Sequence, residues 1–211
     1  MKNRVKTLIL TLIIDLIPIV VGTILSDKLP DQMVTHWNFE GVADGWSSKA
    51  FTVYVLPLIF VAVNIVCCFS IFLDPKRKNI GDTLFDLCLW IIPVLSIFTF
   101  AQTIGTGLGY EINPSKIMPV FICLLFIIIG NYLPKTKQSY TMGIKIPWTL
   151  ESEENWNKTH RMAGFLWVVC GIIGLVCSLF GFLNPVVFLT LIFVMVLVPV
   201  IYSYLLYRKG I

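Results

Sequence analysis

Apolar residues are grouped into six long stretches that are separated by shorter polar segments. Each stretch approaches the roughly 20 residues that a helix needs to cross the hydrocarbon core of a bilayer. Because backbone groups without partners cannot face lipid, and no segment alternates like a barrel strand, we expect every stretch to be a helix. The predicted fold class is all-α, a polytopic integral membrane protein with about six transmembrane helices. The predicted spans are Thr7–Leu25, Phe51–Leu73, Thr83–Ile104, Ile117–Leu133, Ala163–Phe182 and Pro185–Tyr207.

Composition supports a membrane environment. Of the 211 residues, 57% are hydrophobic and only 13% are charged, whereas an average soluble domain has about 25% charged residues. A domain of this length leaves much of its surface in water and could not hide so much apolar area in one core. The first apolar stretch is longer than that of a usual signal peptide and precedes no small-residue cleavage site, so we expect a retained helix.

Basic residues lie almost entirely on one side of the six predicted spans. Only Lys28, Lys49 and Lys116 lie on the other side. Since loops rich in lysine and arginine stay in the cytoplasm, both chain ends are predicted to be cytoplasmic. The net charge of +4 is then explained by membrane orientation, and we expect no direct binding to nucleic acid. The thirteen residues on the basic side are Lys2, Arg4, Lys6, Lys76, Arg77, Lys78, Lys135, Lys137, Lys145, Lys158, Arg161, Arg208 and Lys209.

Two loops are too long to be simple connections, and they suggest two membrane domains. Residues 1–73 are predicted to form an N-terminal domain whose loop 26–50 faces outside. Residues 74–211 are predicted to form a C-terminal four-helix domain whose loop 134–162 faces the cytoplasm.

The outer loop combines aromatic and polar residues around a turn signal. Asp44-Gly45 predicts a turn, because glycine adopts positive φ at little cost. Trp37, Phe39 and Trp46 suit the boundary between membrane and water, so one interpretation is a loop held at the lipid headgroups. The alternative is a recognition surface with polar contacts from His36, Asn38, Glu40 and Asp44.

The inner loop contains a helix start and a row of large side chains. Ser152 is expected to cap a helix whose first turn is acidic, which suits the helix dipole. Trp156, His160 and Trp167 then share one helical face, and we expect this helix to lie along the inner interface before it enters the fifth span. These residues, together with Trp148, either anchor the loop at the membrane or form a docking surface for a cytoplasmic partner.

Asp15 is the exceptional residue inside the spans. A charge at mid-bilayer costs about 2.5–3.5 kcal/mol on insertion scales, so we expect Asp15 to be protonated, paired or turned toward a hydrated interior. A structural hydrogen bond between helices and proton coupling are both open interpretations. The candidate partners are Asn64, Gln102 and Asn131.

The sequence lacks the patterns of catalysis and metal binding. Its two histidines, His36 and His160, are predicted on opposite sides of the membrane, and neither has the neighbours that zinc ligation needs. There is no HExxH, GxSxG or P-loop pattern, and the six cysteines lie in apolar stretches without a CxxC pair. We therefore expect no enzyme activity, no cofactor and no metal site.

Two motifs resemble the SdpI family, which is named for the immunity protein against the sporulation-delaying killing peptide of bacilli. The outer-loop motif comprises Leu29-Pro30, His36-Trp37-Asn38, Gly41 and Asp44-Gly45-Trp46-Ser47-Ser48-Lys49. The inner-loop motif comprises Asn131-Tyr132-Leu133-Pro134-Lys135, Gly143-Ile144-Lys145-Ile146-Pro147-Trp148-Thr149-Leu150, Trp156, Thr159-His160-Arg161 and Gly164. Asp74-Pro75-Lys76 fits as well, so the resemblance runs along most of the chain.

The resemblance implies a multi-pass immunity protein and sensor of the bacterial cell membrane rather than an enzyme. Its partners would be membrane lipids, a secreted antimicrobial peptide outside and a small DNA-binding autorepressor inside. The residues implied for peptide sensing are His36, Trp37, Asn38, Asp44, Trp46 and Lys49. The residues implied for repressor docking are Lys76, Arg77, Lys78, Trp148, Trp156 and His160.

Two hypotheses of a different class stay open. The first is a small proton-coupled transporter or exporter that uses the intramembrane residue Asp15, with Asn64 as a polar neighbour. The second is a purely structural membrane protein, in which neither loop has a role beyond folding.

Overall fold

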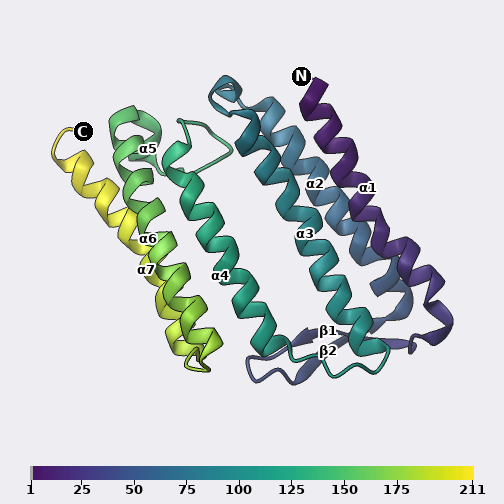
Figure 1. Cartoon of the computed structure of the whole chain (residues 1–211). Helices are drawn as coiled ribbons and strands as arrows, with labels where there is room; N and C mark the ends of the chain where they lie inside the picture. The colour runs from purple at the N-terminus through teal and green to yellow at the C-terminus, as the bar shows by residue number, and fades with distance from the viewer. Residues whose placement is uncertain (1) are drawn as a thin grey trace. The chain divides into compact units, whose positions relative to one another are not determined.

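The computed structural model describes residues 2–211, and this part of the chain contains six helices long and apolar enough to cross a membrane (Figure 1). Each predicted span overlaps one of them, which confirms the all-α polytopic fold class. The second span begins with a π-helical turn, Phe51–Val55. The helices are α1 (Lys2–Ile24), α2 (Leu56–Leu73), α3 (Asp82–Gly107), α4 (Pro114–Tyr132), α6 (Glu153–Leu179) and α7 (Pro185–Arg208), with a short α5 (Pro147–Glu151) before α6.

The chain forms two compact units. The first comprises Met1–Phe72 and Asp82–Ser115, and the second comprises Leu73–Gly81 and Lys116–Ile211. The loop between α2 and α3 belongs to the second unit because its side chains bond to the loop that follows α4. The division of the chain after residue 73 rests on the two loop motifs and stays a prediction.

In the first unit, α1 packs against α3 and against the start of the second span. Near the beginning of α1, the hydroxyl of Thr7 donates to Asp86 Oδ1 of α3 at 2.8 Å. Near its end, a Cβ on Gly22 would lie 2.7 Å from Val53 Cγ1 and 3.1 Å from Phe100 Cζ, so the helices approach closely there. The buried positions on α1 recur every three or four residues; they are Thr11, Asp15, Pro18 and Gly22.

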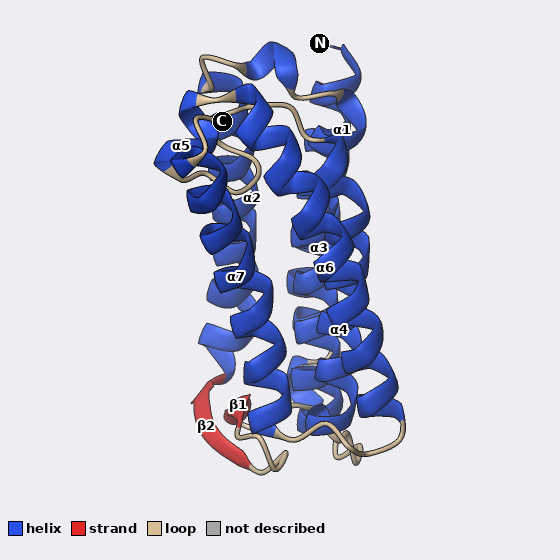
Figure 2. Ribbon diagram, turned by 90° about the vertical axis from the view of Figure 1, so that its left-hand side faces the viewer, coloured by secondary structure: helices blue, strands red, loops and turns tan. Residues whose placement is uncertain are grey.

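A β-hairpin lies at the end of the first unit opposite to the amino terminus (Figure 2). Its antiparallel strands are β1 (Gln32–Trp37) and β2 (Ala43–Ser48). The sequence predicts only a loop here, because β2 contains aspartate, glycine and serine, which are uncommon in strands.

The turn predicted at Asp44-Gly45 is wrong. Both residues lie within β2, and the chain reverses at residues 38–42, where Gly41 has a φ of +80°. Gly45 pairs with His36, and a Cβ on Gly45 would lie only 2.8 Å from the Cβ of His36. This glycine therefore permits close strand pairing instead of a turn.

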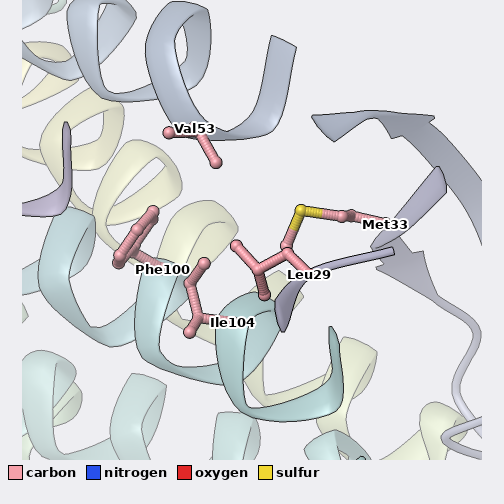
Figure 3. Packing of buried hydrophobic residues seen from close by; sticks show 5 residues of the cluster. All are labelled: Leu29, Met33, Val53, Phe100 and Ile104. Carbon is pink, nitrogen blue, oxygen red and sulfur yellow. The ribbon is translucent and has the colours of Figure 1, made fainter. Parts of the chain in front are cut away.

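An apolar cluster fixes β1 to the helices (Figure 3). Met33 of β1 is fully buried and packs with Leu29, which precedes the strand. The helical members are Val53, at the start of the second span, and Phe100 and Ile104 of α3. The hairpin is therefore held on the helices of its unit rather than attached only at its two ends.

In the second unit, α6 is one continuous helix. The hydroxyl of Ser152 accepts a hydrogen bond from the Asn155 amide at 3.2 Å, so the predicted cap at Ser152 is confirmed. The helix that begins there runs into the fifth span as expected, because no proline interrupts the single helix Glu153–Leu179; its position along the interface stays a prediction.

Glycines bring α4 and α6 of the second unit into backbone contact. A Cβ on Gly130 would lie 2.8 Å from the Cβ of Trp167, and a Cβ on Gly171 would lie 3.1 Å from the carbonyl oxygen of Cys123. Small residues allow helices in a membrane to approach this closely. We call this contact the glycine seam; its residues are Gly130, Gly164 and Gly171.

Candidate functional site

Three of the six residues predicted for peptide sensing are exposed on the hairpin. Alternate residues of a strand point to opposite faces, and Asp44 and Trp46 lie on the exposed face of β2. His36 Nδ1 lies 2.5 Å from Asp44 Oδ1, with 72% of the His36 side chain and 44% of the Asp44 side chain exposed. Trp46 is 56% exposed. We refer to the exposed hairpin residues His36, Asp44 and Trp46 together as the hairpin face.

The other three residues hold the hairpin in shape. Asn38 Oδ1 accepts hydrogen bonds from two backbone amides of the turn, at 3.0 and 2.9 Å. Lys49 Nζ donates to two backbone carbonyls of the segment before β1, at 3.2 and 3.1 Å. Trp37 is half-buried. The structure thus separates the predicted set into an exposed face and the residues that position it, while the sensing role itself stays a prediction.

In the second unit, the carboxylate of Asp74 joins two loops that are far apart in the sequence. Its Oδ2 accepts hydrogen bonds from the amides of Tyr140 and Thr141, both at 2.9 Å, and from the Thr141 hydroxyl at 2.7 Å. Its Oδ1 accepts from the Lys76 amide at 2.7 Å. We call Asp74 and these three partners the Asp74 cluster.

The same hydrogen bonds determine the charge of Asp74, which is only 3% exposed. Burial by itself would raise the pKa of this carboxyl. The Thr141 hydroxyl and the three amides stabilise the anion, however, and together they hold the pKa of Asp74 below its usual value. Asp74 is therefore ionised at neutral pH, with donors on both of its oxygens.

Gln138 connects the Asp74 cluster to α5. Its Oε1 accepts a hydrogen bond from Lys76 Nζ, and its Nε2 donates to the carbonyls of Thr149 and Leu150 at 2.8 and 2.7 Å. Asn79 Nδ2 donates to the backbone carbonyl of Gln138 at 2.7 Å. Both polar ends of this buried side chain are thus used to hold loops together.

Trp156 and His160 are fully buried beneath the inner loop, and their rings stack with centroids 4.0 Å apart. Trp156 Nε1 donates to the carbonyl of Thr136 at 2.9 Å. The Ile144 amide donates to His160 Nε2 at 2.8 Å, so the ring proton is on Nδ1, which faces the carbonyl of Trp156 at 2.8 Å. The two residues therefore shape the loop from within, and their predicted role in docking stays a prediction.

The remaining residues predicted for docking lie nearer the surface. Arg77 and Lys78 are exposed, whereas Lys76 is half-buried against Gln138. Trp148 is half-buried, and its ring lies 5.1 Å, between centroids, from the ring of Tyr204. A cleft of about 340 Å³ opens beside the loops; it is lined by Asn79, Lys137, Gln138, Glu153, Trp156 and Asn157.

Asp74 and Gln138 are central to the inner loops but are not singled out as site residues by the sequence. For Asp74 a signal exists, because an aspartate directly follows the last apolar residue of α2 and precedes a basic run. For Gln138 no signal exists, since its role depends on backbone carbonyls that only the folded loop brings together.

Asp15 bonds to Asn64 inside the first unit. Asn64 Nδ2 donates to Asp15 Oδ2 at 2.8 Å, and both side chains are fully buried. Of the three candidate partners, Asn64 is thus the one that contacts Asp15. The Gln102 side chain is buried without a hydrogen-bond partner among the described residues, and Asn131 belongs to the second unit.

These features define the class first: a multi-pass helical membrane protein with a rigid hairpin in one unit and tied polar loops in the other. Residues 135–203 match the SdpI/YfhL protein family, and residues 13–61 match a domain of unknown function (DUF1648). The chain is 26% identical over 205 residues to "Immunity protein SdpI" of Bacillus subtilis (strain 168), and the matched region covers 97% of each of the two chains. These matches confirm the resemblance to the SdpI family. Together with the six long apolar helices, they support a multi-pass protein of the bacterial cell membrane. No solved structure matches the chain.

Proposed function

We propose that this chain is a membrane immunity protein that protects its producer from a secreted antimicrobial peptide. Similarity to an immunity protein along nearly the whole of both chains supports this class of function. The observation that supports a sensing role is the hairpin face, where His36, Asp44 and Trp46 are exposed on a hairpin that Met33 fixes to the helices.

The chemistry of the hairpin face suits a peptide ligand. Trp46 offers a large ring of the kind that often dominates binding energy at interfaces, and the His36–Asp44 pair offers a carboxylate and an imidazole on the same hairpin. Because the strands are already paired, little conformational entropy is lost when a peptide binds. The open backbone edge of a two-stranded sheet can also pair with an extended peptide.

Survival of a sensitive bacterium that expresses this chain tests the proposal, with a sporulation-delaying-type peptide as the challenge. We expect the wild type to protect, and His36→Ala and Trp46→Ala to lose most of the protection at an equal level of inserted protein. Tyr110→Ala is the matched control, because Tyr110 is an aromatic residue of the same unit that is 68% exposed outside the hairpin. Undiminished protection by both hairpin variants would refute the role of the hairpin face.

We further propose that the loops of the second unit face the cytoplasm and hold a small DNA-binding autorepressor. The exposed basic residues Arg77 and Lys78 support this, because they lie next to loops that Asp74 and Gln138 make rigid. If a small helix-turn-helix repressor is encoded beside the gene for this chain, a membrane pull-down of that repressor is the test. Retention of the repressor by an Arg77→Glu, Lys78→Glu double variant, compared with a Lys28→Glu control, would refute the docking role.

A second candidate function is proton-coupled transport through Asp15. The observation that favours it is a carboxyl group fully buried at the middle of an apolar helix, with an amide as its only bonded partner among the described residues. This function requires transport to be lost in Asp15→Asn and retained in Asp15→Glu. Equal transport by the wild type and both variants would eliminate it.

A further inference from the structure

Buried polar atoms without a partner are concentrated in the first unit. Among the described residues, every buried side-chain oxygen or nitrogen that lacks a hydrogen bond belongs to this unit. Such groups cost about 1–3 kcal/mol each when nothing satisfies them, so native proteins contain few of them. Two of these atoms belong to residues that are already bonded to each other, namely Asp15 Oδ1 and Asn64 Oδ1.

Both of these atoms are acceptors if Asp15 is ionised. Asn64 Nδ2 donates to Asp15 Oδ2 at 2.8 Å, which leaves the second carboxyl oxygen and the amide oxygen without a donor. An ionised carboxylate can only accept hydrogen bonds, whereas a protonated carboxyl has one O–H donor. A single proton on Asp15 Oδ1 would turn this oxygen into a donor, and the unpartnered oxygen of Asn64 is an acceptor on the residue that already bonds to Asp15.

Among the described residues, the second span and α3 contain no lysine, arginine or histidine, and the basic residues of α1 lie only in its first turns. The contacts of Thr7 with Asp86 and of Gly22 with Phe100 set the register of α1 and α3. Asp15 lies midway between them, so on α3 it is level with Pro93, and Ser96 follows within about one helical turn. Besides Asp15, the ionisable residues of α1, the second span and α3 are Lys2, Arg4, Lys6, Tyr54, Cys67, Cys68, Asp82, Asp86 and Cys88, and Arg4 pairs with Asp82.

Ser96 adds an independent observation at this level. The hydroxyls of Thr99 and Thr103 on the same helix donate to the carbonyl four residues earlier, at 2.8 and 3.1 Å. The Ser96 hydroxyl is 1% exposed and makes no such bond. It is therefore a buried hydroxyl near the middle of α3 that its own helix does not use.

We propose that Asp15 and Asn64 form a proton-binding site at mid-depth of the first unit, in which the neutral acid of Asp15 donates to the amide oxygen of Asn64. The ligand is one proton, held by a carboxyl and an amide from two different helices. The site requires neither an antimicrobial peptide nor a repressor, so its test is independent of the proposed immunity function.

Infrared spectroscopy of the full chain in lipid nanodiscs tests the site directly. The C=O stretch of a carboxylic acid is distinct from the carboxylate and amide bands, and it shifts in heavy water. At neutral pH we expect such a band in the wild type, its loss in Asp15→Asn, its retention in the matched variant Asp86→Asn, and a displaced band in Asn64→Leu. If Asp15→Asn removed a carboxylate band and no acid band, the proposal would be overturned.

Thermal stability gives a second readout. Asp15→Asn has the shape of the neutral acid, and an amide pair makes the same two hydrogen bonds, so we expect its melting temperature to equal that of the wild type at neutral pH. At alkaline pH the wild type should lose more stability than Asp15→Asn, because only the wild type has a carboxyl group at this position that can ionise. A marked loss of stability in Asp15→Asn at neutral pH would contradict the neutral acid.

The same spectra recorded in sodium chloride and in choline chloride separate a proton from a metal cation. We expect identical acid bands in both salts at constant pH. Replacement of the acid band by a carboxylate band when sodium is added would assign these oxygens to a bound cation and overturn the proposal.

Discussion

Asp74 binds Thr141 twice, through the backbone amide at 2.9 Å and through the hydroxyl at 2.7 Å. The two residues are 67 positions apart in the sequence. One carboxylate thereby joins the loop after α2 to the loop after α4, and the order of both loops depends on its charge.

Acidification should weaken this junction. The pKa of Asp74 is lower in the folded protein than in the unfolded chain, so its ionisation stabilises the fold at neutral pH. That contribution is lost as the pH falls through the folded pKa. We expect the melting temperature of the wild type to fall on acidification more steeply than that of Asp74→Asn, which cannot ionise at this position.

Tryptophan fluorescence melts over a pH series measure this difference. At neutral pH, Asp74→Ala should cost about 1–3 kcal/mol for each buried amide left without an acceptor. Asp27→Ala, at an exposed aspartate, serves as the control and should cost little. Parallel pH profiles for the wild type and Asp74→Asn would contradict the role of this carboxylate.

Gly143→Ala should be strongly destabilising for two physical reasons. Gly143 has a φ of +103°, and a Cβ there would lie 2.5 Å from His160 Nε2 and 2.8 Å from the Trp156 ring. Gly109→Ala isolates the conformational part, because Gly109 has a φ of +88° and open space around it. Left-handed backbone costs about 1–2 kcal/mol per residue, so Gly143→Ala should exceed Gly109→Ala by the cost of displacing the two rings. Equal losses in chemical denaturation would show that the rings yield freely.

Protection and stability should separate at the hairpin. An exposed pair such as His36 and Asp44 typically contributes no more than about 1 kcal/mol. We therefore expect His36→Ala to melt like the wild type even where survival against the peptide is lost. A large drop in its melting temperature would instead assign His36 a structural role.

Gly45→Ala should reduce protection without changing any exposed side chain. Its new Cβ would lie 2.8 Å from the Cβ of His36 and force the strands apart. Gly81→Ala is the control, because Gly81 has ordinary φ and nothing within 4 Å of a Cβ. Equal survival with both variants would show that the geometry of the hairpin face is unimportant.

Reporter fusions test the predicted orientation. Green fluorescent protein at the carboxyl terminus should fluoresce, and alkaline phosphatase inserted in the turn near Gly41 should be active, because the former folds in the cytoplasm and the latter outside. Alkaline phosphatase inserted near Lys78 should be inactive. The reverse pattern would place the hairpin inside and exclude contact with a secreted peptide there.

The spans could be predicted because the membrane imposes one strong requirement on each of them. Apolar length gives the six helices, and the cost of a buried charge draws attention to Asp15 and to polar residues such as Asn64. The cap at Ser152 was also predictable, since it depends on neighbouring residues alone.

The loops could not be predicted in the same detail, because the role of each loop residue depends on contacts with residues that are distant in the sequence. Asp44-Gly45 has the composition of a turn, yet Gly45 is required by the approach of His36 on the other strand. Trp156 has the composition of an interfacial anchor, yet it is buried because its indole N–H meets the carbonyl of Thr136. Neither requirement is visible until the backbone of the loop is in place.

The glycine seam has a mechanical consequence for the second unit. At Gly130 the backbone packs against a side chain of the other helix, and at Gly171 it packs against the backbone of the other helix. Because neither glycine has a side chain, no change of rotamer at these positions can absorb a displacement. A displacement of one helix should therefore displace its neighbour by nearly the same amount, and α4 and α6 should move as one rigid body.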